Sequence, residues 1–165
     1  MLQRIQTLYL FLVFTIDTLL LIANPIYAEF QMKAGDGKGP TTVLMQFWKQ
    51  VSMGTNLELP ISSFKFLNLV FMILIAILAI YTIFLYQNRK SQIKIAKLLV
   101  VSNVIFLLVI LVDFYLTKRQ FVELISLNTL GFQIIWPVLL MVFASLALIG
   151  IRTDEKLVQS MDRIR

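Results

Sequence analysis

Hydrophobic residues along this chain are gathered into four long runs, instead of recurring at the spacing of a half-buried surface helix. The runs cover about residues 5–23, 66–86, 98–116 and 131–151. Each run is long enough to cross the ~30 Å hydrocarbon layer of a bilayer as an α-helix. None shows the polar and apolar alternation of a membrane β-barrel strand. The pattern therefore predicts an all-α membrane protein, a single membrane domain built as a bundle of four transmembrane helices.

The segments between and after the runs differ in length and polarity. Residues 27–63 form a long connection, and residues 117–130 form one of intermediate length. Residues 87–97 form a short basic connection without any acidic residue, and residues 152–165 form a polar, charged tail. The first two connections are expected on one side of the membrane, and the third connection and the tail on the other.

Both connections on the first of these sides contain segments typical of β-strands. Residues 41–48 are rich in β-branched and aromatic side chains and follow a Gly/Pro cluster, and residues 121–127 alternate in part. One interpretation is that the two segments pair as a small β-sheet above the bundle. The other is that they form irregular loops or interfacial helices.

The tail carries apolar residues at helical spacing, with acidic residues at its start and basic residues at its end. This charge order suits the dipole of a helix. We expect a short amphipathic helix on the cytoplasmic side that lies on lipid or docks onto a partner. The docking residues would be Leu157, Val158, Met161 and Ile164.

Composition narrows the chemistry that the chain can perform. Of its 165 residues, 59% are hydrophobic and 15% are charged, whereas soluble domains carry about 25% charged residues. The chain has no Cys and no His, which excludes disulfides, thiolate nucleophiles, Cys/His zinc sites and His-ligated haem. No nucleophile–base pair, phosphate-binding glycine loop or metal-ligand cluster is present in the sequence. We therefore expect no enzymatic activity, no catalytic residue, no cofactor and no metal site.

Positive charge predicts the orientation of the bundle. If both termini lie on the same side as residues 87–97, that side holds nine Lys and Arg residues and the other side holds six. Lys and Arg near helix ends favour the cytoplasm, so both termini are expected there. The net charge of +6 is thus explained without nucleic acid. The basic cluster serves as a topology anchor or contacts anionic lipid headgroups; it consists of Arg89, Lys90, Lys94 and Lys97.

The first hydrophobic run has a second interpretation as a secretory signal peptide. Arg4 precedes the apolar stretch, which ends in Ile26-Tyr27-Ala28 before a possible cleavage position. However, Asp17 interrupts the stretch, and Ile26 is larger than the small residue preferred three positions before a cut. We favour a retained transmembrane helix.

Two carboxylates fall inside predicted spans, Asp17 and Asp113. An acid at the centre of a membrane helix costs about 2.5–3.5 kcal/mol and usually has a partner. The predicted topology puts Lys65 at the level of Asp113, so an intramembrane polar or ion-pair site formed by these residues and Asn68 is possible. In the simpler interpretation, Asp113 reaches the headgroups and Asp17 hydrogen-bonds to a neighbouring helix through Asn68.

Seven aromatic residues fall near the predicted membrane surfaces, where Trp and Tyr concentrate. We interpret them as an interfacial belt rather than as a ligand site. They are Phe30, Phe47, Trp48, Tyr81, Tyr86, Tyr115 and Trp136.

Three separated stretches are similar to a known family. They are the opening MLQRIQTLYL at residues 1–10, IFLYQNRKSQIK at residues 83–94, and the ending IGIRTDEKLVQSMDRIR at residues 149–165. Together they resemble a family of small four-helix bacterial membrane proteins, typical of the Bacteroidota, that is classed as a domain of unknown function. The resemblance implies four spans, with the first run retained, and implies no activity. Asp17 is not part of the family pattern.

These observations lead to two functional hypotheses. The first is a non-enzymatic integral inner-membrane protein that acts as a subunit, scaffold or assembly partner of a membrane complex. Its partners would be the lipid bilayer and other inner-membrane proteins or further copies of itself, with no nucleic acid. The alternative is a small oligomeric proton- or cation-coupled transporter that uses Asp17 and Asp113, because intramembrane acids commonly mark ion pathways.

Overall fold

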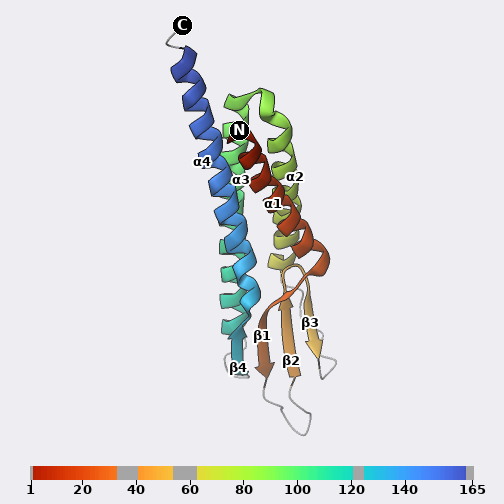
Figure 1. Cartoon of the computed structure of the whole chain (residues 1–165). Helices are drawn as coiled ribbons and strands as arrows, with labels where there is room; N and C mark the ends of the chain where they lie inside the picture. Colours follow the sequence, from red (N-terminus) through yellow and green to blue (C-terminus); the bar gives the residue numbers. More distant parts are fainter. Residues whose placement is uncertain (1, 33–40, 54–62, 121–124, 163–165) are drawn as a thin grey trace.

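Four long helices form the body of the molecule and run alternately up and down (Figure 1). The computed structural model describes residues 2–32, 41–53, 63–120 and 125–162. Each of the four helices contains a segment long and apolar enough to span a membrane, which agrees with the predicted number of spans. The helices are α1 (Leu2–Ala23), α2 (Ser63–Phe84), α3 (Arg89–Gln120) and α4 (Ile135–Asp162).

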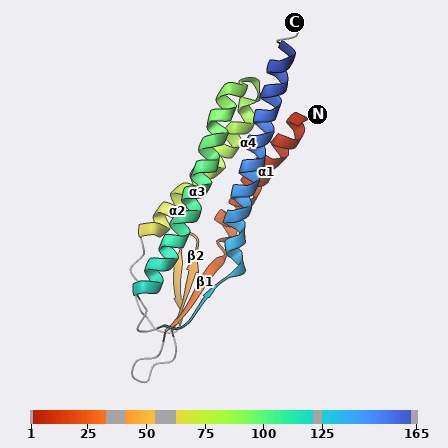
Figure 2. The same ribbon diagram turned by 90° about the vertical axis from the view of Figure 1, so that its left-hand side faces the viewer.

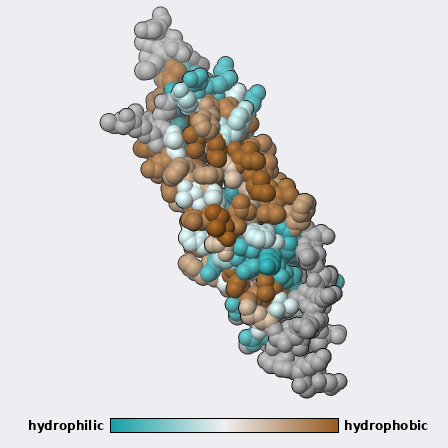
Figure 3. Space-filling model, turned by 90° about the vertical axis from the view of Figure 1, so that its right-hand side faces the viewer, coloured by the Kyte–Doolittle hydropathy of each residue, from teal (hydrophilic) through white to brown (hydrophobic). Residues whose placement is uncertain are grey.

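The helices surround a common apolar interior. α1 contacts α2 and α4, and α3 contacts the same two helices from the other side. Residues such as Leu10, Met72, Phe106 and Leu140, one from each helix, are fully buried between them. Outward-facing positions are also apolar, and hydrophobic side chains dominate the middle of the molecule in Figure 3. A helix that is apolar on every side is suited to lipid, so the chain is a multi-pass membrane protein.

A four-stranded antiparallel sheet lies at one end of the bundle, opposite the two termini (Figures 1 and 2). Of the two interpretations left open for these segments, the small sheet is confirmed. The two segments expected to pair directly are separated by another strand, because the strand order is β3-β2-β1-β4. Part of the second segment, residues 121–124, lies outside the described residues. The strands are β1 (Ile26–Met32), β2 (Thr41–Gln46), β3 (Gln50–Met53) and β4 (Ile125–Leu130).

The central strand β1 follows α1 after a sharp turn. Asn24 ends the helix with φ of 40°, a left-handed conformation that Asn tolerates well, and Pro25 follows it. Tyr27 and Phe30 are both fully buried although they lie three residues apart, because an irregularity in the strand register between Ile26 and Ala28 interrupts the alternation of faces. The turn therefore converts the direction of α1 into that of the sheet.

Aromatic side chains fill the space between the sheet and the helices. Phe30 stacks on Phe114 with ring centroids 5.4 Å apart, and Phe47 lies 6.3 Å from Phe106. Phe30 and Phe47 were predicted to belong to an interfacial belt, and for these two residues the prediction is wrong. They lie on the inner face of the sheet region, so they pack against helices instead of facing lipid headgroups.

Two helices extend beyond the predicted spans. A short 3₁₀ helix (Leu85–Gln87) and Asn88 connect α2 to α3, so residues 89–97 form the first turns of α3 and are not a loop. The tail is helical as far as Asp162, but it continues α4 and does not form a separate short helix. The predicted docking residue Ile164 lies outside the described residues.

Candidate functional site

An ion pair buried at the base of the sheet is the main polar feature of the bundle. Lys65 lies in the first turn of α2, and Asp113 lies on α3 two turns before that helix ends. The Lys65 Nζ to Asp113 Oδ2 distance is 2.8 Å, and each side chain is only 1% exposed. Isolated charges at such a position would be very costly, so each requires its partner.

Tyr27 and Gln46 complete the surroundings of the Lys65 ammonium group. Lys65 Nζ donates to Tyr27 Oη at 3.0 Å and to the backbone carbonyl of Gln46 at 2.8 Å. An ammonium group has three donors, and Asp113, Tyr27 and Gln46 supply three acceptors. We call Tyr27, Gln46, Lys65 and Asp113 the junction cluster, because it joins β1 and β2 to α2 and α3.

The Tyr27 hydroxyl acts within this cluster as both donor and acceptor. It donates to Asp113 Oδ2 at 2.7 Å while it accepts from Lys65. Burial raises the pKa of the Tyr27 hydroxyl well above its usual value, and the charge of Asp113 and the hydrogen bond to it raise the pKa further. Tyr27 therefore keeps its proton and holds the carboxylate.

Further hydrogen bonds connect the sheet to the helices around the cluster. Asn68, one turn beyond Lys65, donates from Nδ2 to the carbonyl of Phe47 at 3.1 Å. The Asn24 side chain donates to Gln46 Oε1 at 3.1 Å, and the backbone N–H of Gly131 donates to the Tyr27 carbonyl at 2.8 Å. The contact region is thus fixed by side-chain and backbone hydrogen bonds from several elements.

Asp17 lies apart from this cluster. It is fully buried on the inner face of α1, and within the described residues neither of its carboxylate oxygens has a hydrogen-bond partner. The predicted hydrogen bond between Asp17 and Asn68 is wrong, because the Asn68 amide is directed to Phe47. Asp113 does not reach the headgroups either, because burial and its bonds to Lys65 and Tyr27 hold it inside. Of the four predicted site residues, the structure thus unites Lys65 and Asp113, with Asn68 beside them.

The opposite end of the bundle contains a second polar contact between distant segments. Gln6 Nε2 on α1 donates to the carboxylate of Asp154 on α4, and both side chains are buried. Arg89 donates from Nη1 to the Asp154 backbone carbonyl at 3.2 Å. Gly150 permits this approach, since a Cβ added there would lie 2.8 Å from Gln6 Cγ.

The other residues predicted for lipid or partner contacts are mostly at the surface. Lys90, Lys94 and Lys97 are exposed, whereas Arg89 is half-buried against α4. Leu157 is exposed and Val158 is half-buried. These positions are compatible with headgroup or protein contacts.

Sequence reasoning missed the residues that the sheet contributes, Tyr27 and Gln46. Both fall in a segment that was interpreted as a long outer loop. The one signal in the sequence was the alternation of apolar and polar residues from Ala28 to Met32, shortly after Pro25. Since β1 was not predicted as a strand, the direction of its side chains could not be inferred.

The chemistry available to the junction cluster is structural. Its three ammonium donors and the Tyr27 hydroxyl are all engaged within the protein. Among the residues described, no group of three or more Asp, Glu, His or Cys residues could hold a metal ion. The arrangement can fix the sheet on the bundle and can exclude water from the ion pair.

Comparison with known proteins identifies a family and adds no activity. No curated protein matches the chain. A family described as "Domain of unknown function (DUF4293)" matches residues 2–164, almost the whole sequence. The protein with its four membrane helices and its clamped sheet is therefore a member of the DUF4293 family.

Proposed function

We propose that this protein is a non-enzymatic subunit, scaffold or assembly partner of a membrane complex, and that its sheet carries the main binding surface. The observation that carries the proposal is the junction cluster. Lys65 and Asp113 are each 1% exposed, and they hold two strands through Tyr27 and Gln46. A sheet held in this way keeps one orientation relative to the membrane, as a docking surface requires.

The energetic cost of the cluster supports this interpretation. Burial of an ion costs several kcal/mol even after relaxation, and a well-packed apolar pair is often at least as stable. Stability alone therefore does not explain Lys65 and Asp113. A need for fixed geometry explains the pair, because the Lys65 ammonium group is fully hydrogen-bonded only when β1, β2 and α3 all provide their acceptors. We infer that the position of the sheet matters for function.

The sheet region offers apolar side chains to a partner. Met53 on β3 is 58% exposed, and Trp48 and Leu130 are also accessible. In the described part of the chain, β3 and β4 are the two edges of the sheet. Edge strands present backbone N–H and C=O groups to another protein chain. The partner would be another inner-membrane protein or a second copy of this chain.

The helical tail is the competing surface for such a partner. Leu157 on α4 is 50% exposed and directly follows the charged residues Glu155 and Lys156. It would contact a partner on the other side of the membrane from the sheet. The experiment therefore has to separate the two ends of the molecule.

Affinity purification from native membranes in several mild detergents tests the proposal. The wild-type chain should recover one reproducible partner, or a second tagged copy, in stoichiometric amount. Met53→Lys should reduce this recovery at least fivefold, whereas Leu157→Lys, at a similarly exposed position, should leave it unchanged. Recovery of the lone protein in every detergent would overturn the proposal. Loss with Leu157→Lys alone would assign the binding surface to the tail.

We further propose that both termini lie in the cytoplasm of a bacterial cell and that the sheet lies outside the inner membrane. The basic cluster at the start of α3 supports this orientation, because it lies at the end of the bundle opposite the sheet (Figure 1). Lys90, Lys94 and Lys97 are exposed there and free to contact anionic headgroups.

A second candidate function is a small oligomeric proton- or cation-coupled transporter. The observation that favours it is Asp17, a buried intramembrane carboxyl without a hydrogen-bond partner among the described residues. Asp113, the other acid considered, is already used by the junction cluster. Purified protein in liposomes should then show proton or cation flux that Asp17→Asn abolishes and that the exposed variant Leu157→Lys retains. Equal flux in wild type and Asp17→Asn would exclude this function.

A further inference from the structure

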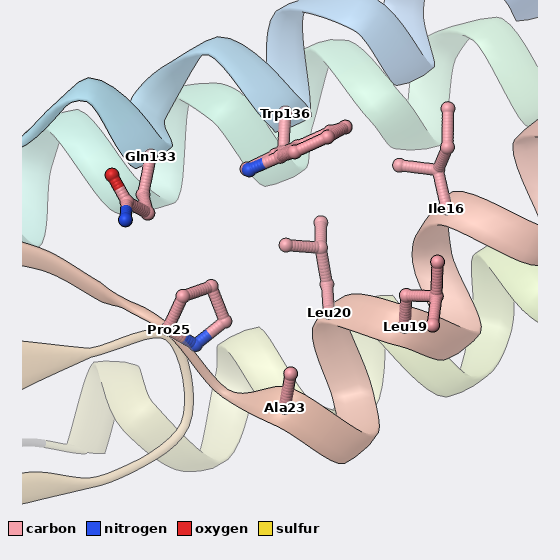
Figure 4. A pocket seen from close by; sticks show the side chains of 7 residues that line it. All are labelled: Ile16, Leu19, Leu20, Ala23, Pro25, Gln133 and Trp136. Carbon is pink, nitrogen blue, oxygen red and sulfur yellow. The ribbon is translucent and has the colours of Figure 1, made fainter.

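A pocket of about 300 Å³ opens between the end of α1 and the start of α4 (Figure 4). Leu19, Leu20 and Pro25 form much of its wall, and Trp136 closes it from the side of α4. Leu20 is buried, whereas Leu19 and Trp136 are 58% and 38% exposed. The pocket therefore has an inner wall against the bundle and an open mouth on the outer surface of the helices.

The polarity of the pocket changes along its length. Ile16 and Leu19 line the part nearer the middle of the bundle, and Pro25 and Gln133 line the part nearer the sheet. Figure 4 shows the Gln133 amide and the indole nitrogen of Trp136 at this second, sheet-side part. Hydrogen-bond donors are thus confined to one end of an otherwise apolar pocket.

The depth of the pocket in the membrane indicates what can enter it. The candidate spans Ile5–Ala23 and Phe132–Ser160 both reach their sheet-side ends here. The apolar end of the pocket thus lies at hydrocarbon depth, and the polar end lies at the interface, where Trp side chains concentrate. Since the mouth opens on the lipid-exposed flank, a ligand would enter from the bilayer.

We propose that this pocket binds one diacyl phospholipid, which is held by an acyl chain and its ester carbonyl. The chain packs along Leu19 and Leu20, and the ester carbonyl accepts a hydrogen bond from the Trp136 indole N–H or the Gln133 amide. Among the described residues, no charged side chain lines the pocket, so headgroup charge does not select the lipid. This inference is independent of the proposed role of the sheet.

Native mass spectrometry of the full chain tests the lipid site. Delipidated protein in mild detergent is titrated with palmitoyl-oleoyl phosphatidylethanolamine or with the corresponding phosphatidylglycerol. Wild type should form a saturable 1:1 complex with similar affinity for both lipids. Ala23→Trp places an indole in the pocket from its exposed wall and should weaken the complex at least fivefold. Ile22→Trp is the matched control, because Ile22 is 77% exposed and does not line the pocket.

A second variant keeps the test decisive if the first one misfolds. Trp136→Phe retains an aromatic wall and removes one hydrogen-bond donor, which should weaken binding by about two- to tenfold. Equal lipid affinity in wild type, Ala23→Trp and Ile22→Trp would overturn the proposal. A more than tenfold preference for phosphatidylglycerol would overturn it as well, because the headgroup would then dominate. Lipid binding that never saturates would also count against the proposal. So would a co-purifying protein that occupies the pocket in place of lipid.

Discussion

The junction cluster shows how a single pair of residues can decide where a sheet sits on a membrane bundle. Lys65 alone would be an unpaired cation at the end of a membrane helix, and Asp113 alone would be a buried anion. The 2.8 Å contact between them offsets the cost of burying each charge, and the Tyr27 hydroxyl connects the pair to the central strand β1. Loss of one charge therefore does more damage than loss of both.

A double-mutant cycle tests this interdependence. Lys65→Met and Asp113→Leu should each lower the free energy of unfolding by about 3–5 kcal/mol, because each leaves an uncompensated charge. The double variant should recover most of this loss, since no unpaired charge remains. Unfolding of the detergent-solubilised protein by titration with a denaturing detergent measures the three values. Additive losses in the double variant would show that the two charges act independently.

The Tyr27 hydroxyl gives the fold a dependence on alkaline pH. Its pKa is raised in the folded protein, whereas the unfolded chain releases this proton near pH 10. Above that pH the unfolded state binds fewer protons than the folded state, so stability falls as pH rises. Stability measured between pH 8 and 11.5 should decline less steeply for Tyr27→Phe than for wild type. At neutral pH the same variant should lose about 1–3 kcal/mol, because the Asp113 carboxylate loses a donor.

Replacement of Asp17 is expected to stabilise the protein, in contrast to single replacements in the junction cluster. A buried polar group without a hydrogen bond costs about 1–3 kcal/mol in mutational data. Asp17→Leu should therefore raise the free energy of unfolding by a similar amount, whereas Leu10→Asn on the same buried face should lower it. A clear loss of stability in Asp17→Leu would show that Asp17 is held by an interaction beyond the described residues, such as an internal water.

At the scale of elements, the helices could be predicted from the sequence more fully than the strands. Long apolar runs suffice for four spans because lipid requires about 20 apolar residues in a row. β1 pairs with β2 and with β4, and its partner β4 is distant in sequence. A pattern within one short segment of sequence cannot reveal which distant strand that segment pairs with. Lys65 and Asp113 could be placed at one level by counting along helices, but Tyr27 could not, because its direction depends on the sheet.

The contact between α1 and α4 depends on a missing side chain. A Cβ at Gly150 would lie 2.8 Å from Gln6 Cγ, closer than atoms normally approach. Gly150→Val should displace Gln6 from Asp154 and lower the free energy of unfolding by about 1–3 kcal/mol. Leu146→Val, at an exposed position one turn earlier on α4, is the control and should change stability by less than about 0.5 kcal/mol. Denaturing-detergent titration compares the two, and equal effects would contradict the role assigned to Gly150.

At the scale of the whole molecule, the two ends differ in kind. One end carries the sheet, and the other carries both termini and the basic start of α3 (Figure 2). The ends therefore face different compartments, and the distribution of Lys and Arg predicts which compartment each end faces. This asymmetry follows from an even number of spans and needs no knowledge of side-chain packing.

Cysteine labelling tests the orientation without background, because the chain has no Cys. Met53→Cys on β3 should react with a membrane-impermeant maleimide in intact spheroplasts, since Met53 is exposed. Ser160→Cys, near the end of α4, is also exposed and should react only after the membrane is permeabilised. The reverse pattern would place the sheet in the cytoplasm and invert the proposed topology.

The strand order also has a consequence for the timing of biogenesis. Tyr27 leaves the ribosome early, but Asp113, which its hydroxyl contacts, is made 86 residues later. β4, the last neighbour of β1, follows only after α3 is complete. In the proposed orientation, β1 and Lys65 therefore cross or enter the membrane before Asp113 and β4 have been made. Closure of the sheet reports that the first three helices have been inserted, and only the fourth then remains to be added.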